Sequence, residues 1–304
     1  MEEKKYKDFT LYNDNEKNVF IHIDIESVNF YNKVLSYFFD ENKLLCYIKN
    51  KTNITFQSTI TDFVSLYKKI NDFIDEENFS IDSVDFKKEL ERYIDWENYS
   101  REELLTLRRD KVGKIGEYIF HNILIEYFNL CCIIPKLNLV TNRNMSIYGI
   151  DVIFYDFNDN SLIFGESKVS QSLDNGINLI NDSLKNYEHQ ISEEFRAILS
   201  SQTLPIENIP DEMKIYIDQC INFKKFIEVA NIKKIGIPLF IMHGDDYDID
   251  IIFEKLKKIK AAHVLGLEIE YIIISLPILD KNIFQTTLLQ FLREKSDYFE
   301  SHTE

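Results

Sequence analysis

The sequence predicts an α/β protein in which a mixed β-sheet is flanked by helices, with a smaller α/β region at the N-terminus. Three observations lead to this fold class. Apolar, β-rich runs alternate with segments of helical spacing along the C-terminal two thirds of the chain. A pair of β-rich runs within residues 150–169 is separated by turn formers, as in a hairpin. Two later strands are continuously apolar, which is typical of a sheet covered on both faces.

Length and composition favour a globular protein. The 304 residues are 45% hydrophobic and include only 8 glycines and 5 prolines, so long regular elements are expected. No apolar run reaches the length of a membrane span and no signal-peptide core begins the chain, so we expect a cytoplasmic protein that contacts no membrane. The 4 cysteines lack metal-binding spacing and are expected to be reduced thiols. The net charge of −16 opposes binding to phosphates, so a nucleic acid, if one is bound, would have to be held locally or largely by a partner.

The first domain is expected to cover residues 1–98. Apolar spacing predicts strands at 18–25, 43–48 and 53–56 and helices at 27–39, 61–74 and 84–94. His22, Asp24 and Glu26 share one face of the first strand, which suggests a metal site. Simple alternation with a polar outer face is the interpretation that we favour. The region contains no catalytic motif.

The second domain, residues 99–304, is expected to begin with a helix over 102–128. This helix contains Gly113 and Gly116, and each interior glycine costs about 1 kcal/mol relative to alanine. Two glycines three residues apart would let the helix backbone approach a sheet closely, which would place Glu117 near the carboxylates of the hairpin. A solvent-facing glutamate is the alternative.

The remaining elements are expected in alternating order. Apolar patterns predict a strand at 131–140, a long helical region to about residue 200, a helix at 208–222, a strand at 235–242, a helix at 251–262, a strand at 268–275 and a helix at 282–295. Polar groups that accompany these elements are the basic run Arg108, Arg109, Lys111 and Lys114, the helical residues Tyr187, His189 and Gln190, and the loop His243-Gly244-Asp245-Asp246. The basic run fits either phosphate contacts or a solvated helix surface. The loop resembles a metal-binding loop, although a polar turn explains it adequately.

The candidate catalytic residues lie in the predicted hairpin. Two β-rich runs, 150–156 and 162–169, flank the turn formers at 157–161. Residues that pair in an antiparallel hairpin lie at equal distances from the centre of the turn. The midpoint of Asp151 and Glu166 falls in that centre, so we expect the two carboxylates to lie side by side at the open end of the hairpin, with Glu166 and Lys168 outside the core.

A lysine joins the two carboxylates. Glu166 and Lys168 are two residues apart and therefore point to the same face of their strand. Two close carboxylates repel each other unless a cation is present, and Mg²⁺, or Mn²⁺ in its place, favours a few carboxylates plus waters. The ammonium beside such a metal can orient or deprotonate a water, or stabilise charge on a phosphate. A solvated hairpin end with one ion pair is the alternative.

These residues resemble a known signature. Gly149-Ile150-Asp151 and Gly165-Glu166-Ser167-Lys168 resemble the PD-(D/E)xK nucleases, with Asp151 as the aspartate, Glu166 as the acid and Lys168 as the lysine. Ile150 stands where that signature has a proline, which is not a ligand. With the Gly113–Glu117 helix before it and a helix and strand after it, the hairpin resembles a restriction-endonuclease-like core. More narrowly, it is similar to the HamA family of the Hachiman anti-phage defence system.

The resemblance implies an activity, a metal and a partner. It implies an Mg²⁺-dependent DNA nuclease in which Glu117, Asp151 and Glu166 hold the metal and Lys168 completes the catalytic set. It also implies a HamB-like helicase subunit that restrains the nuclease. The N-terminal domain is then the expected docking surface, so deleting the residues before Glu97 is expected to cost complex formation more than folding. A binding module that keeps a nuclease-like fold for assembly is the alternative.

Overall fold

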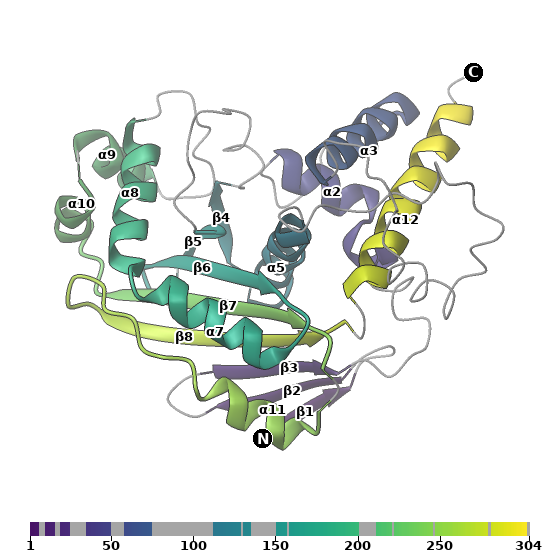
Figure 1. Cartoon of the computed structure of the whole chain (residues 1–304). Helices are drawn as coiled ribbons and strands as arrows, with labels where there is room; N and C mark the ends of the chain where they lie inside the picture. Colours follow the sequence, from purple (N-terminus) through teal and green to yellow (C-terminus); the bar gives the residue numbers. More distant parts are fainter. Residues whose placement is uncertain are drawn as a thin grey trace.

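The structure is a computed structural model, and it describes thirteen stretches of the chain. The described residues are 1–5, 10–15, 19–24, 35–49, 58–74, 112–128, 130–134, 150–156, 158–200, 211–220, 222–245, 247–278 and 281–302. They form one eight-stranded mixed sheet with helices on both faces (Figure 1). The predicted α/β class is therefore confirmed.

The sheet joins the N-terminal strands to those of the hairpin. In spatial order its strands are β1 (Glu2–Lys5), β2 (Thr10–Asn15), β3 (Val19–Asp24), β8 (Glu268–Pro277), β7 (Lys234–His243), β6 (Ser161–Val169), β5 (Val152–Asp156) and β4 (Cys131–Ile134). The four central strands β3, β8, β7 and β6 run parallel to one another, whereas the outer pairs are antiparallel. The first and second predicted domains thus contribute to the same sheet.

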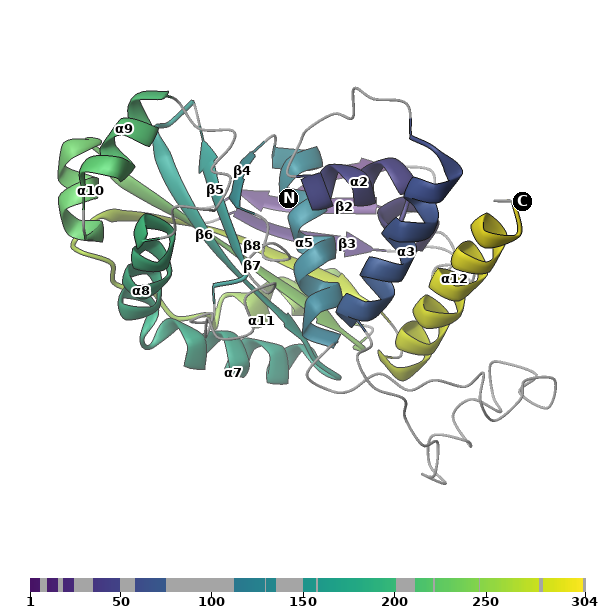
Figure 2. The same cartoon turned by 90° about the horizontal axis from the view of Figure 1, so that it is seen from above.

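Two layers of helices cover the sheet, and each layer buries its own apolar cluster (Figure 2). One layer contains α2 (Glu41–Lys49), α3 (Ile60–Ile74), α5 (Val112–Phe128) and α12 (Lys281–Ser301). The other contains α7 (Leu173–Leu184), α8 (Tyr187–Ser200), α9 (Asp211–Gln219), α10 (Phe223–Val229) and α11 (Ile249–Leu256). None of the helices in the described stretches combines the length and the apolar content that a bilayer span requires.

Most predicted elements are present, and one expectation is wrong. The expected strand at 43–48 is the helix α2, because the Asp40 carboxylate accepts the backbone N–H of Asn42 and so begins a helix there. The expected helical region up to about residue 200 is present and consists of two helices, separated by a turn at Lys185 and Asn186. The sequence patterns did not predict β1, β2 or α10.

Several expectations fall outside the described residues. They are Glu26, most of the helix at 27–39, the strand at 53–56, the helix at 84–94, the start of the helix at 102–128 with Arg108, Arg109 and Lys111, the end of the strand at 131–140, the start of the helix at 208–222, Asp246, and the boundary between residues 98 and 99.

Candidate active site

The hairpin has the register that the sequence predicts. Val152 of β5 pairs with Gly165 of β6, and continuing this register by one residue places Asp151 opposite Glu166. The backbone N–H of Asp151 also donates a hydrogen bond to the Gly165 carbonyl at 2.9 Å. Asp151 and Glu166 are therefore paired because they lie at equal distances from the turn of the hairpin, as the sequence predicts.

Glu166 is the central residue of the cluster. Its Oε1 accepts hydrogen bonds from Lys168 Nζ and, at 2.9 Å, from Ser183 Oγ of α7. The Lys168 side chain is 25% exposed, so its ammonium connects the buried carboxylate with the surface. The expectation that Glu166 lies outside the core is wrong, because the residue is only 1% exposed. The strand β6 continues to Val169, and α7 contacts the face that carries Glu166.

The electrostatics of Glu166 favour a bound cation. Its Oε2 is buried and has no hydrogen-bond partner. Burial and the neighbouring Asp151 carboxylate raise the pKa of Glu166 and Lys168 lowers it, and together these effects bring the pKa to about 8. In the absence of a metal, the carboxyl group is therefore largely protonated near neutral pH. A cation beside Oε2 would favour the ionised form.

Asp151 is held in place by the backbone and side chain of one serine. Its Oδ2 accepts hydrogen bonds from Ser167 N at 2.6 Å and Ser167 Oγ at 2.8 Å. Sequence reasoning did not assign roles to Ser167 or to Ser183. Ser167 lies inside the Glu-Ser-Lys motif, so its position was a usable signal. Ser183 had none, because its contact with Glu166 depends on how α7 packs against the sheet.

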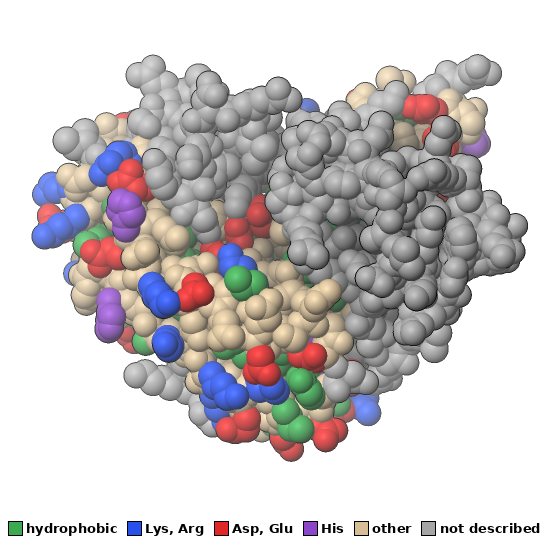
Figure 3. Space-filling view, viewed as in Figure 1, with side chains coloured by type: hydrophobic (Ala, Val, Ile, Leu, Met, Phe, Trp, Pro, Cys, Tyr) green, Lys and Arg blue, Asp and Glu red, His purple; other side chains and the backbone are tan. Residues whose placement is uncertain are grey.

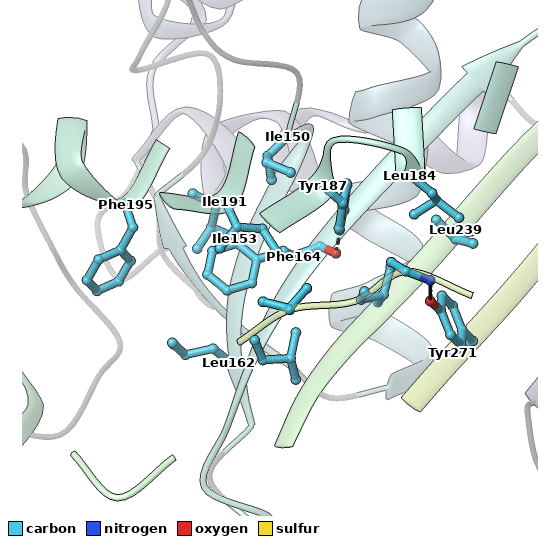
Figure 4. Close-up of a cluster of buried hydrophobic side chains, with 14 of the residues drawn as sticks. Ile150, Ile153, Leu162, Phe164, Leu184, Tyr187, Ile191, Phe195, Leu239 and Tyr271 are labelled. Atoms are coloured by element: carbon cyan, nitrogen blue, oxygen red, sulfur yellow. Dashed lines mark hydrogen bonds between the residues drawn. The ribbon is translucent and has the colours of Figure 1, made fainter. Parts of the chain in front are cut away.

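A cluster of apolar side chains fixes the strand just before the motif. Figure 4 shows Tyr187 and Phe164 within this cluster, and the Tyr187 hydroxyl donates to the Phe164 carbonyl at 2.8 Å. Burial, followed by the nearby Glu166 and Asp151 carboxylates, raises the pKa of the Tyr187 hydroxyl, so this buried residue lies beside the candidate site. His189 is exposed and Gln190 is half-buried. The cluster also anchors the backbone two residues before Glu166.

The helix α5 approaches the sheet closely at one of its two glycines. A Cβ atom on Gly116 would lie 2.6 Å from Val169 Cγ2 and 3.8 Å from Ser167 Oγ. A Cβ atom on Gly113 would meet nothing within 4 Å. The predicted close approach is therefore confirmed at Gly116 and wrong at Gly113.

Glu117 lies on a helix that contacts the face of β6 opposite to Glu166. It follows Gly116 and is half-buried, and α5 covers the face of β6 opposite to the one that carries Glu166 and Lys168. Within the described ranges, no three His, Cys, Asp or Glu side chains are grouped so as to hold a metal ion. A metal role for Glu117 stays a prediction.

The remaining donors fit a magnesium ion. Mg²⁺ is bound by hard oxygen ligands, usually one or two carboxylates together with waters and substrate oxygens. Asp151 and Glu166 supply two such carboxylates, and the unpartnered Oε2 of Glu166 offers a buried oxygen for which the described residues provide no other use.

Comparison with known proteins matches nearly the whole chain to one family. The family model for HamA matches residues 13–292. No curated protein matches the chain, and neither does any solved structure. The matched range extends well beyond the C-terminal two thirds that carry the motif, and it includes β3 together with every candidate site residue. The chain therefore belongs to the HamA family of anti-phage defence proteins.

Proposed function

We propose that this protein is a metal-dependent deoxyribonuclease of the PD-(D/E)xK type that acts in anti-phage defence together with a HamB-like helicase. The observation that carries the proposal is the state of Glu166. It is a buried carboxyl group opposite Asp151, it is paired with Lys168, and one of its oxygens has no partner. Perturbed ionisable groups of this kind concentrate at functional sites.

Each residue of the site then has a distinct task. Asp151 and Glu166 would hold Mg²⁺ or Mn²⁺, which when bound polarises a phosphate oxygen and lowers the pKa of a water. Ser167 orients the Asp151 carboxylate, and Ser183 orients that of Glu166. Lys168 has its ammonium at the exposed side of the pair, where it can donate to a phosphate oxygen or hold the attacking water.

A partner that delivers DNA would compensate for the acidity of the chain. The net charge of −16 repels a polyanion. Figure 3 shows acidic and basic side chains intermixed over the described part of one face, where no broad basic surface is visible. A helicase with a basic channel supplies the affinity that this surface lacks, and it determines when substrate arrives at the site.

The decisive experiment compares two lysine variants in a DNA cleavage assay. The protein, alone and with its helicase, is incubated with linear DNA and Mg²⁺ or EDTA. We expect cleavage only with the metal, and Lys168→Ala should reduce it at least about a hundredfold. The control, Lys185→Ala, removes an exposed lysine from the turn after α7 and should cleave normally. Undiminished cleavage by the Lys168→Ala protein would show that the assignment is wrong.

A non-catalytic assembly module is the second candidate. It draws on one observation, namely that the described residues gather two carboxylates at the site rather than three. This candidate predicts that the complex binds DNA but produces no metal-dependent cleavage. The same assay therefore separates the two functions.

A further inference from the structure

A second polar site lies across α7 from Glu166, and the proposed nuclease chemistry does not use it. It is a pocket of about 350 Å³. Its polar and aromatic lining comes from Tyr12, His22, Asp24, Asp245, Tyr247 and Asp248. Two motifs that looked unrelated in the sequence, at His22 and at the loop after His243, meet here because β3, β8 and β7 are parallel neighbours.

The register of the sheet separates the pocket from the candidate active site. Lys168 pairs with Ile241, Ile241 with Ser275, and Ser275 with His22, so the four residues form one row across the sheet. Three strand spacings of about 4.8 Å place His22 about 14 Å from Lys168 along that row. The helix α7 lies between them, since a Cβ atom on Gly176 would be 2.4 Å from Ile241 Cγ2.

A buried serine links two histidines at this site. His22 Nδ1 lies 3.1 Å from Ser275 Oγ, and His243 Nε2 lies 2.8 Å from the same oxygen. Burial lowers the pKa of His22 to about 4 and that of His243 to about 3, so both rings are neutral at neutral pH. Ser275 has one hydroxyl hydrogen, so one imidazole donates to its oxygen and the other accepts from it.

His22 offers an unused nitrogen to the pocket. The residue is only 4% exposed and lines the pocket, and its Nε2 has no hydrogen-bond partner among the described residues. In the tautomer in which His22 Nδ1–H donates a hydrogen bond to Ser275 Oγ, Nε2 carries a lone pair and can accept a hydrogen bond from an N–H group.

The other walls of the pocket favour positive charge. Asp24, Asp245 and Asp248 line it, and none of the described lining residues is a lysine or an arginine. Lys255 lies close to this lining, because its ammonium is 4.7 Å from the centroid of the Tyr247 ring, and it pairs with Asp174 of α7. The described lining itself is therefore acidic.

Aromatic side chains complete these walls. Tyr12 and Tyr247 line the pocket beside the aspartates. Ring faces attract organic cations in addition to the attraction of the carboxylates.

We propose that this pocket binds an organic cation that carries a guanidinium or alkylammonium group. Its N–H groups would donate hydrogen bonds to His22 Nε2 and to the aspartates, while its apolar part lies against the tyrosines. A volume of this size accommodates a small molecule or one long basic side chain. A bare divalent ion fits less well, because the described His and Asp side chains are not grouped in threes around one point.

The test is isothermal titration calorimetry on the full chain with three probes. Agmatine carries a guanidinium and an ammonium group, N-acetylarginine amide carries a guanidinium on a peptide backbone, and butanediol is neutral. We expect saturable binding of the cationic probes and no binding of butanediol. Tighter binding of agmatine identifies a free amine as the ligand, whereas tighter binding of N-acetylarginine amide identifies a basic side chain of a protein.

Two aspartates at the start of α11 supply a matched pair of variants. Asp248 lines the pocket and precedes α11 without capping it through its side chain, so Asp248→Asn should fold normally. It should weaken agmatine binding about tenfold, because one charge-assisted contact is lost. Asp250→Asn makes the same charge change at an exposed position outside the pocket and should leave binding unchanged.

Three results would overturn the proposal. They are no binding of either cationic probe, equal weakening by Asp248→Asn and Asp250→Asn, and displacement of agmatine by equimolar MgCl₂. Equal weakening would indicate general attraction to an acidic chain, and displacement would indicate a divalent site. Lys168→Ala should bind agmatine as the wild type does, so the outcome is independent of the nuclease proposal.

Discussion

The two oxygens of Glu166 lie in different environments. Oε1 accepts from Lys168 and Ser183, whereas Oε2 is buried without a partner. A single carboxyl group therefore combines an ion pair with an unfilled ligand position. Burial and, after it, the neighbouring Asp151 carboxylate raise the pKa of this group although a lysine contacts it.

The raised pKa of Glu166 predicts how stability depends on pH without metal. The folded-state pKa of about 8 exceeds the ordinary value of 4.5, so the folded chain binds the extra proton between them. This contribution to the free energy of unfolding is fully present below the ordinary pKa and is lost as pH rises through the folded pKa, with a slope of up to about 1.4 kcal/mol per pH unit. Urea denaturation in EDTA at several pH values measures it.

Two variants and a metal titration check this prediction. Glu166→Gln should remove the pH dependence, whereas Glu254→Gln, at an exposed position on α11, should keep it. Mg²⁺ should stabilise the wild type more at high pH than at low pH, because the metal displaces the proton. Identical pH slopes for wild type and Glu166→Gln would contradict the assignment.

At the scale of elements, α5 and α7 hold the hairpin from opposite faces. The helix α5 touches β6 through Gly116, and α7 reaches it through Ser183. The candidate site therefore depends on how closely two helices approach the same strand.

The two glycines of α5 predict opposite effects of one substitution. Gly116→Ala places a methyl group 2.6 Å from Val169 Cγ2, and a valine side chain rotates little, so we expect a loss of about 1 to 3 kcal/mol. Gly113→Ala meets no atom within 4 Å and should gain up to about 1 kcal/mol from helix propensity. Chemical denaturation of both variants gives the comparison, and equal effects would mean that the close approach is absent.

The hairpin was predictable and its surroundings were not. Its register follows from the symmetric placement of Asp151 and Glu166 about the turn, which is local information. The burial of Glu166 arises from α7, whose packing no local pattern encodes. Residues 43–48 were mistaken for a strand, since a short apolar run fits a buried strand and a buried helix equally well.

At the scale of the whole molecule, the N-terminal strands continue the central sheet. β3 pairs in parallel with β8 and lies between it and β2. No sequence pattern indicates which distant strands become neighbours, so the meeting of His22 with Ser275 and His243 was not predictable either. The same continuity changes the expectation that the N-terminal residues can be removed at little cost to folding.

Deleting the residues before Glu97 should destabilise the remainder rather than only its complex. The deletion removes Ile21 and Ile23 from an apolar cluster and leaves β8 as an unpaired edge. We expect circular dichroism of the truncated chain to show loss of cooperative unfolding. Deleting Met1–Lys5 removes only β1, an edge strand with all four residues exposed, and should leave folding intact. A cooperative transition in the longer truncation would contradict this prediction.

The two attachments of α7 have a thermodynamic consequence. Near its start, the Leu173 N–H donates to Asp245 of the cation pocket at 2.7 Å, and near its end Ser183 donates to Glu166. One short helix thus contacts both sites. If a ligand of the pocket shifts this helix enough to change metal affinity by some factor, the metal changes the affinity for that ligand by the same factor. Each site then reports the occupancy of the other.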